Sequence, residues 1–198
     1  MPTLMKIYKV DKSFCDYCLQ VAKDTAKNSS CWQSSTVLWS EGIKNHIHGS
    51  CMVTQTPEIL KEMILKELDG YLPKITKNGP IKRYATMFYV WQPYSGISKH
   101  SDYGYPFAAT LYLNHTWDVD WGGNFLYYDG EIDWDRLKSD EEYMYNNENW
   151  KVVVPEIGTM VVNDNESLHL VTPIAPTCPE MRYTIQIWGM SEKGVPTV

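Results

Sequence analysis

The chain has 198 residues, of which 43% are hydrophobic and 13% aromatic, and its formal net charge is −6 at pH 7. This composition excludes a disordered chain and predicts one globular domain over residues 1–198, because the length is sufficient for a substantial core. The acidic balance, without any run of Lys or Arg, predicts no nucleic-acid partner.

No apolar stretch approaches the ~20 residues that a membrane-spanning helix needs, and residues 1–6 lack the apolar core of a signal peptide. The five cysteines are an odd number, which favours a reducing compartment over a disulfide framework. We therefore expect no membrane association and a cytoplasmic location.

Residues 1–80 are predicted to form a mainly helical N-terminal support. A first short strand is expected over 7–10. A helix is expected over about 14–28, with the side chain of Asp11 or Ser13 as its N-terminal cap.

Two short motifs in this N-terminal part imitate metal sites. Cys15-x-x-Cys18 lies in the first predicted helix without a second cysteine pair, so we interpret it as two small helix residues, at least one of them buried. His46-x-His48 lies among short strand-like runs over 31–55, with no carboxylate or third ligand convincingly placed. We interpret it as a loop or as the rim of a substrate site.

A second helix begins near Thr56-Pro57-Glu58, where a capping hydroxyl, a proline in the first turn and an acid at the positive helix end come together. Gly70 and Pro73 end it. Its apolar residues recur at helical spacing and are expected to pack on the outer face of a β core. They are Ile59, Leu60, Met63, Ile64 and Leu68.

Short strands dominate the remaining chain. The predicted strands are 84–92, 107–114, 123–128, 151–154, 158–163, 169–174 and 182–188. Many short strands after N-terminal helices indicate a mainly β fold with supporting α, in which two sheets face each other or close. The insert 131–150 is acidic and aromatic, and it is either a solvated helix and loop or a lid over the substrate.

The triplet His100-Ser101-Asp102 and the distant His169 are the candidate metal ligands. On an extended segment, residues two apart point to the same face, so His100 and Asp102 would address one metal while Ser101 faces away. The triplet alone is also typical of a polar surface loop. With His169 on a neighbouring strand, however, the three side chains form a 2-His-1-carboxylate set, which suits non-haem Fe(II) oxygenases because it leaves coordination positions open.

Arg182 opens a strand-like run that ends at Trp188. Alternation puts Arg182, Thr184, Gln186 and Trp188 on one face and Tyr183, Ile185 and Ile187 on the other. An arginine on an inner face is costly unless a carboxylate meets it, and a guanidinium binds a carboxylate through two parallel hydrogen bonds. The alternative is an arginine on an edge strand, paired with a surface acid.

From about Tyr84 to Met190 the chain resembles the 2-oxoglutarate- and Fe(II)-dependent dioxygenases, and among them the prolyl 4-hydroxylase-like branch. The resemblance rests on an ordered set of motifs: His100-Ser101-Asp102, Leu111-Tyr112-Leu113-Asn114 with Trp117, Trp121-Gly122-Gly123-Asn124-Phe125-Leu126, His169-Leu170-Val171, and Arg182 with Trp188. It implies a double-stranded β-helix (jelly-roll, cupin-like) core over 84–190, with the N-terminal helices packed on the outer sheet.

The same resemblance implies a role for each matched position. His100, Asp102 and His169 would bind Fe(II), and with Arg182 they would be the catalytic residues. Arg182 would bind the distal carboxylate of 2-oxoglutarate, to which Tyr112 would donate a hydrogen bond. The remaining residues expected around the co-substrate are Thr184, Thr110, Phe125 and Val171, with Trp188 near the metal.

Three features depart from the family pattern. The interval from His169 to Arg182 is longer than usual and contains Pro173, Pro176 and Pro179. Many collagen-type relatives have a lysine at the anchor position. A tyrosine usually found shortly before the H-x-D triplet falls on Val90, and the candidates to replace it are Tyr89, Trp91 and Tyr94.

The resemblance implies hydroxylation of an unactivated C–H bond with Fe(II), 2-oxoglutarate and O2, and with ascorbate as a reductant. A peptidyl proline is the first expectation for the substrate. Trp91, Tyr94, Tyr103 and Tyr105 could hold a proline ring, but they suit a free amino acid or another small metabolite equally. An inactive jelly-roll binding module and a zinc-dependent hydrolase are the remaining alternatives, and the sequence leaves the oligomeric state open.

Overall fold

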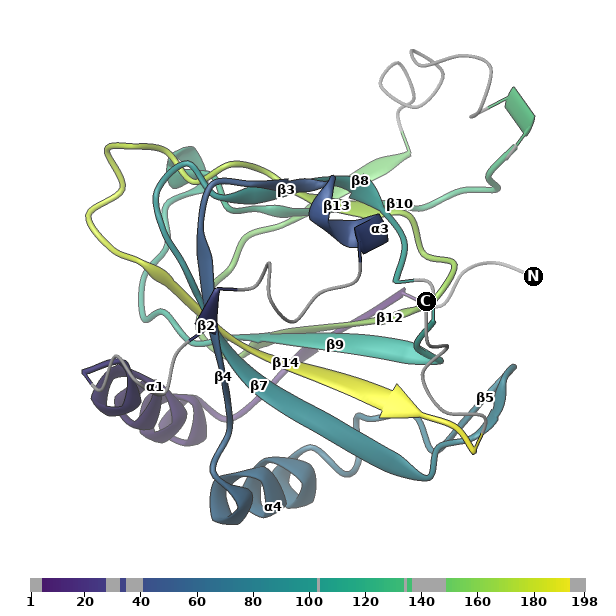
Figure 1. Ribbon diagram of the computed structural model, residues 1–198, viewed down its shortest axis with the longest axis horizontal. Helices are drawn as coiled ribbons and strands as arrows, with labels where there is room; N and C mark the ends of the chain where they lie inside the picture. Colours follow the sequence, from purple (N-terminus) through teal and green to yellow (C-terminus); the bar gives the residue numbers. More distant parts are fainter. Residues whose placement is uncertain are drawn as a thin grey trace.

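The computed structural model describes residues 5–27, 33–34, 41–102, 104–133, 135–136 and 149–192. Two antiparallel sheets face each other, and two helices cover the outer face of the larger sheet, so that the molecule has three layers (Figure 1). Among these residues, no helix has both the length and the apolar character needed to cross a membrane.

The larger sheet has seven strands. Their spatial order is β1 (Met5–Lys9), β12 (Thr159–Asp164), β9 (Phe107–Tyr112), β14 (Arg182–Met190), β7 (Arg83–Trp91), β4 (Cys51–Gln55) and β2 (Gln33–Ser34). The smaller sheet follows the order β11 (Trp150–Val153), β10 (Phe125–Tyr128), β13 (His169–Val171), β8 (Gly96–His100) and β3 (Ile47–His48). Strands distant in sequence are therefore neighbours in both sheets, which confirms the expected mainly β jelly-roll core.

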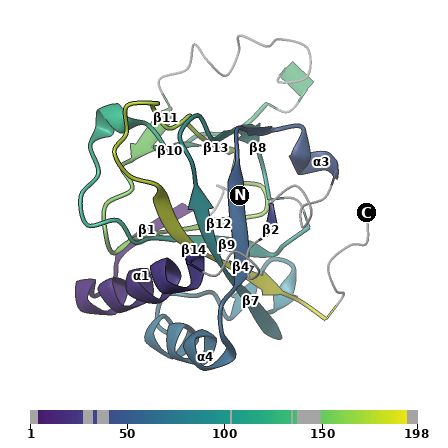
Figure 2. The same ribbon diagram turned by 60° about the vertical axis from the view of Figure 1, so that its left-hand side comes forward.

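The helices are placed by their apolar faces. Side chains from α1 (Lys12–Ala26) and α4 (Glu58–Glu67) form one buried cluster with the larger sheet, and Figure 2 shows both helices against its outer face. Cys15 and Cys18 are both buried in this cluster as free thiols, which confirms their interpretation as core residues. The short elements α3 (Glu41–Lys44), a 3-10 turn (Val119–Trp121) and the hairpin β5 (Ile75–Thr76) and β6 (Gly79–Pro80) complete the fold.

Two expectations for α4 were wrong. Leu60, Ile64 and Leu68 face the sheet, but Ile59 is 78% exposed and Met63 is 41% exposed. Only the stripe of residues four apart reaches the sheet, because each residue turns the helix by about 100° and carries Ile59 and Met63 to the side. The Thr56 hydroxyl also does not cap the helix; it donates to the carbonyl oxygen of Thr86 on β7, and the cap residue Pro57 has no side-chain hydrogen bond.

The two faces of β14 separate as the alternation predicts. Ile185 and Ile187 lie in the cluster beneath the helices, whereas Trp188 packs into the second cluster between the sheets. In the sheet, Arg182 pairs with Trp91 and Thr184 pairs with both Tyr89 and Tyr112. The space between the sheets therefore receives the polar face of this strand.

Some boundaries differ from the predictions. β8 was not expected, because its sequence, Gly-Ile-Ser-Lys-His, is short, polar and opens with glycine. β13 ends at Val171 rather than at residue 174, because the proline at 173 cannot donate to the ladder. Most of the insert 131–150, including Trp134, Tyr143 and Tyr145, lies outside the described residues, so the choice between lid and loop stays open.

Candidate active site

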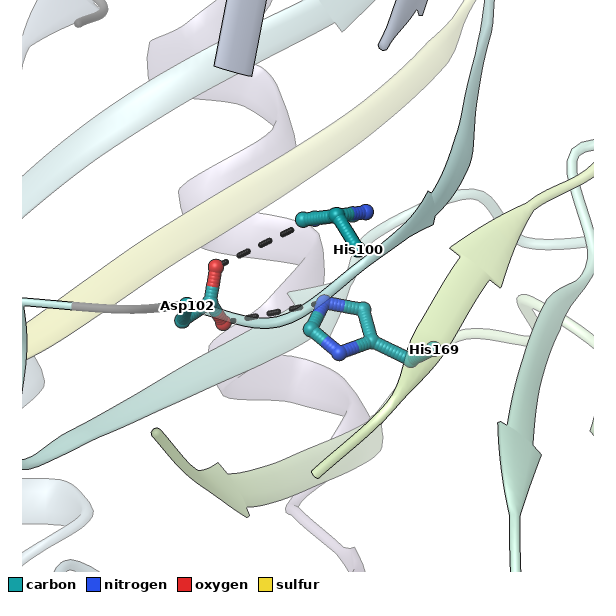
Figure 3. A group of neighbouring side chains, drawn as sticks. All are labelled: His100, Asp102 and His169. Atoms are coloured by element: carbon teal, nitrogen blue, oxygen red, sulfur yellow. Dashed lines mark ion pairs between the residues drawn. The ribbon is translucent and has the colours of Figure 1, made fainter. Parts of the chain in front are cut away.

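The structure brings His100, Asp102 and His169 to one point (Figure 3). His100 is the last residue of β8 and pairs in register with His169, the first residue of the adjacent strand β13. Asp102 follows in the segment after β8. One potential ligand atom from each side chain lies within 4.8 Å of the other two. The Asp102 Oδ1 atom is 3.9 Å from His100 Nε2, and Oδ2 is 3.6 Å from His169 Nε2.

Both imidazoles are held in the tautomer that a metal ligand requires. The Nδ1 atom of His100 is 2.9 Å from the carbonyl oxygen of Ser98, and that of His169 is 2.8 Å from the carbonyl oxygen of Ser167. A carbonyl oxygen only accepts, so Nδ1 carries a proton in each ring, and Nε2, which lies on the side of Asp102, is the nitrogen left for a metal. Burial, and then the neighbouring His169, lower the pKa of His100 to about 4, which keeps that ring neutral.

Two further residues restrain this group. The Phe125 ring stacks on the His169 ring at 5.0 Å between centroids. The Asn163 side chain donates a hydrogen bond of 2.9 Å to Asp102 Oδ2. Sequence reasoning missed Asn163, although one signal existed: the alternation that turns Val161 towards the space between the sheets also turns Asn163 there.

Arg182 is a buried cation at the start of a central strand. It is 2% exposed, its guanidinium lies 5.0 Å from the centre of the Trp91 ring, and one Nη atom donates to the carbonyl oxygen of Gly123. Within the described part of the chain, no ion pair involves Arg182, and its Nε atom has no hydrogen-bond partner. β14 is the fourth of seven strands, so the alternative of an edge-strand arginine with a surface acid was wrong.

The neighbours of Arg182 suit an anion. The Tyr112 ring lies 5.8 Å from the guanidinium, and burial raises the pKa of this phenol to about 12, which keeps it a neutral donor. The Thr184 hydroxyl is fully buried and finds no partner among the described residues. The Thr110 hydroxyl, by contrast, donates to the Gln186 side chain at 2.9 Å.

The glycine pair Gly122-Gly123 explains how the proline-containing interval reaches Arg182. Both residues have positive φ angles, of 68° and 62°. A Cβ at Gly122 would lie 2.1 Å from the carbonyl oxygen of Pro173, and one at Gly123 would lie 3.4 Å from the Arg182 side chain. The interval thus packs directly against this turn, and its extra length does not remove Arg182 from the space between the sheets.

Aromatic side chains gather beside the three candidate ligands. The Trp188 ring lies 5.9 Å from Tyr89 and 5.7 Å from Tyr105, and the Tyr105 backbone N–H donates to the Asp102 carbonyl oxygen. In the family pattern a tyrosine falls at the position of Val90, and Tyr89, Trp91 and Tyr94 were the candidates to replace it. Tyr89 and Trp91 are buried between the sheets, whereas Tyr94 is 65% exposed and is therefore excluded as the replacement. Tyr103 lies outside the described residues.

His46 lies closer to the site than its sequence position indicated. Its Nδ1 atom is 3.0 Å from the Ser98 hydroxyl, and its ring centre is 6.1 Å from that of His100. It does not belong to the three-residue group, and His48 is exposed. The interpretation of this pair as a substrate rim stays a prediction.

The residues present fit a metal with a dicarboxylate co-substrate. Two neutral imidazoles and a carboxylate are the donor set of non-haem Fe(II) oxygenases. The unpartnered Nε of Arg182 and the unpartnered hydroxyl of Thr184 are buried polar atoms that a carboxylate would satisfy. A jelly-roll core with both features defines an iron-dependent oxygenase.

Comparison with known proteins gives the family. The family model described as the 2OG-Fe(II) oxygenase superfamily matches residues 78–190, which is more than half of the chain, and the chain belongs to this superfamily. The cofactors are therefore Fe(II) and O2, with 2-oxoglutarate as co-substrate. No curated protein sequence matches the chain.

Solved structures of similar fold come from several organisms. A Pseudomonas putida prolyl-4-hydroxylase matches 93% of this chain and 91% of its own, at 14% identity and a TM-score of 0.61. A Trichoplax adhaerens prolyl hydroxylase matches 96% and 84%, at 20% identity and a TM-score of 0.63. HygX from Streptomyces hygroscopicus, with nickel and 2-oxoglutarate bound, matches 96% and 84%, at 10% identity and a TM-score of 0.62. At these identities the likeness establishes the fold alone.

Proposed function

We propose that the protein binds Fe(II) through His100, Asp102 and His169, binds 2-oxoglutarate through Arg182, and hydroxylates a proline residue in a peptide or protein. The observation that carries this proposal is the coexistence of the three converging ligands with a buried guanidinium that meets no carboxylate among the described residues. The same proposal treats residues 1–198 as one catalytic domain, since α1 and α4 complete the core of the larger sheet.

Each side chain has a defined task in this proposal. When bound, the iron and 2-oxoglutarate supply the oxidising chemistry, in which O2 is consumed and 2-oxoglutarate yields succinate and CO2. Arg182 neutralises the far carboxylate, and the hydroxyls of Tyr112 and Thr184 donate to it. Phe125 and Val171, which are paired in register on the smaller sheet, exclude water from the other side.

The proposed substrate rests on the aromatic group beside the ligands. Tyr105 and Trp188 are half-buried and offer flat apolar surfaces of the size of a pyrrolidine ring, with Tyr89 buried against Trp188, and Tyr105 is adjacent to Asp102 through its backbone. The Trichoplax structure contains a peptide fragment of the hypoxia inducible factor oxygen degradation domain. A second HygX structure contains hygromycin B, so the fold also accepts a small molecule. The proposal also includes ascorbate as the reductant and a cytoplasmic location for the protein.

The decisive experiment is succinate formation by protein purified without oxygen and loaded with Fe(II). The protein is given 2-oxoglutarate and O2, with and without a panel of proline-containing peptides and of free amino acids. Peptide-stimulated succinate, together with a mass gain of one oxygen atom on the peptide, is the expected result. Stimulation by a free amino acid alone would keep the oxygenase and overturn the peptide substrate. No succinate, with no binding of iron or 2-oxoglutarate, would overturn the proposal and leave a binding module.

A further inference from the structure

The last two residues of β12 reach two of the three candidate ligands by separate routes. Asn163 is 2% exposed, and its side-chain amide donates to Asp102 Oδ2 at 2.9 Å. The same oxygen is 3.6 Å from His169 Nε2, whereas the other carboxylate oxygen, Oδ1, faces His100 Nε2 at 3.9 Å. The amide therefore holds the Asp102 carboxylate in one rotation, with a different oxygen towards each histidine.

The next residue, Asp164, shapes the loop that precedes His169. Its Oδ1 atom accepts from the backbone N–H of Glu166 at 3.0 Å, and from both the backbone N–H and the hydroxyl of Ser167 at 2.9 Å. This turn directs the Ser167 carbonyl oxygen at His169 Nδ1, 2.8 Å away. The Asp164 carboxylate thus acts on the imidazole through a single intervening residue.

His100 has a different support. The Ser98 carbonyl that accepts from its Nδ1 belongs to the same strand, β8, which is fixed by pairing with β13 and β3. His169 begins β13 and pairs with His100 on one side and with Tyr127 on the other, whereas Asp102 lies after the end of β8. The end of β12 therefore adds a side-chain contact to the ligand that lies outside the strands, and it shapes the loop that leads into His169.

We infer that Asn163 and Asp164 are positioning residues for the iron site, an inference that rests on the function proposed above. Asn163 occupies one lone pair of Asp102 Oδ2, which would leave Oδ1 as the better donor atom for a bound metal. Asp164 fixes the ring orientation and the Nδ1–H tautomer of His169. Partners of this kind contribute about 10- to 100-fold in metal affinity or activity.

The test measures Mn(II) affinity, in the absence of 2-oxoglutarate, for the wild type and four variants. Asn163→Leu removes the amide at nearly constant size, and Asp164→Ala removes the acceptor of the turn. Both are expected to weaken Mn(II) binding about 10- to 100-fold. Asp164→Asn retains an acceptor oxygen and is expected to restore most of the affinity lost in Asp164→Ala, which a general loss of packing would not explain.

Asn114→Leu is the matched control. Asn114 is 1% exposed, its amide donates to Met181 O at 2.9 Å and to Glu180 at 3.0 Å, and it does not contact the three ligands. Its removal is expected to lower the thermal unfolding midpoint at least as much as Asn163→Leu, with Mn(II) affinity unchanged. If Asn163→Leu does not fold, Asn163→Ser, which is too short to reach Asp102, replaces it with the same expectation.

The outcomes separate this inference from the proposed function. Wild-type protein that binds no Mn(II) would overturn the proposed function itself. Wild-type binding with unchanged affinity in both Asn163→Leu and Asp164→Ala would overturn the positioning role and leave the function standing. Equal weakening in Asn114→Leu would also overturn it, because the loss would then follow stability. A second readout is succinate formed without any substrate, which is expected to fall in Asn163→Leu in step with metal affinity.

Discussion

The metal end and the co-substrate end of the site differ in how far the protein itself completes them. At the metal end, His100, His169 and Asp102 each have a hydrogen-bond partner that orients them before any ion binds. At the co-substrate end, Arg182 and Thr184 keep buried polar atoms without partners in the described part of the chain. The first end is preorganised, whereas the second would be completed by 2-oxoglutarate under the proposed function.

This difference has an energetic consequence. Removing one partner from a buried charge pair is strongly destabilising, but an unpaired buried charge destabilises the ligand-free protein from the start. Arg182 is such a charge, with a Trp91 ring and one carbonyl oxygen as its nearest compensation. The ligand-free fold therefore carries a cost at Arg182, which 2-oxoglutarate would relieve under the proposed function.

The largest expected effect comes from removing a ligand at the preorganised end. His169→Ala takes away one of three donors, so we expect no stoichiometric Fe(II) and no succinate above background. The measurement is iron per chain after anaerobic loading, followed by the succinate assay. His115→Ala is the control, because His115 is exposed and paired with Asp16 at 3.4 Å. Turnover retained by His169→Ala would contradict the assignment of the metal site.

Arg182→Leu is expected to give the next largest effect and to separate the two ends. The binding of 2-oxoglutarate should weaken roughly 150- to 5,000-fold, which corresponds to about 3–5 kcal/mol for breaking a buried pair. Mn(II) affinity and the unfolding midpoint of the ligand-free protein should not fall, since the leucine removes an uncompensated charge. The two affinities are measured by titration, and the midpoint is measured by thermal unfolding.

Arg182→Lys sharpens the same comparison. A lysine keeps the charge but cannot form two parallel hydrogen bonds with a carboxylate, so 2-oxoglutarate affinity should fall between those of the wild type and Arg182→Leu. A loss of Mn(II) affinity in either variant, equal to the loss for 2-oxoglutarate, would show that the two ends are not independent.

The sequence predicted the candidate metal ligands better than it predicted the residues that hold those ligands in place. The triplet His100-Ser101-Asp102 alone also suits a surface loop, and Arg182 alone also suits an edge strand; these residues stood out because they occur with His169 and the other motifs in the order of a known family. Asn163 carries only the weaker signal of alternation with Val161, because its role depends on the register of β12 against its neighbours and on the path of the chain after β8.

The errors on the helical side have a related cause. The apolar spacing in α4 identifies a helix with a buried face, but the width of that face is set by the sheet that it contacts. Ile59 and Met63 fit the spacing and still lie outside the contact. Likewise, β8 becomes a strand through its pairing with β13 and β3, not through its own residues.

Adding 2-oxoglutarate should stabilise the protein measurably. At ~100 times its Kd a ligand contributes about 2.7 kcal/mol, and for a chain of this size each kcal/mol raises the unfolding midpoint by about 2–4 °C. We therefore expect a rise of roughly 5–10 °C in Mn(II)-loaded wild-type protein. Arg182→Leu at the same concentration should show almost no rise, and an equal rise in both proteins would mean that the co-substrate binds elsewhere.

The smallest expected effects come from two buried threonines, of which Thr110 has a side-chain hydrogen-bond partner and Thr184 has none among the described residues. Thr184→Val removes a hydroxyl that has no partner in the described residues, so it should weaken 2-oxoglutarate binding about 10-fold, near 1.5 kcal/mol for a hydrogen bond to a charged group, without lowering the stability of the ligand-free protein. Thr110→Val breaks the hydrogen bond to Gln186 and should cost about 1 kcal/mol of stability with little change in 2-oxoglutarate affinity. Titration of both variants measures the affinity for 2-oxoglutarate, and thermal unfolding measures their stability. Equal affinity losses would show that the Thr110 hydroxyl also binds the co-substrate. The lack of a partner in the ligand-free protein would then not identify the hydroxyls that bind 2-oxoglutarate.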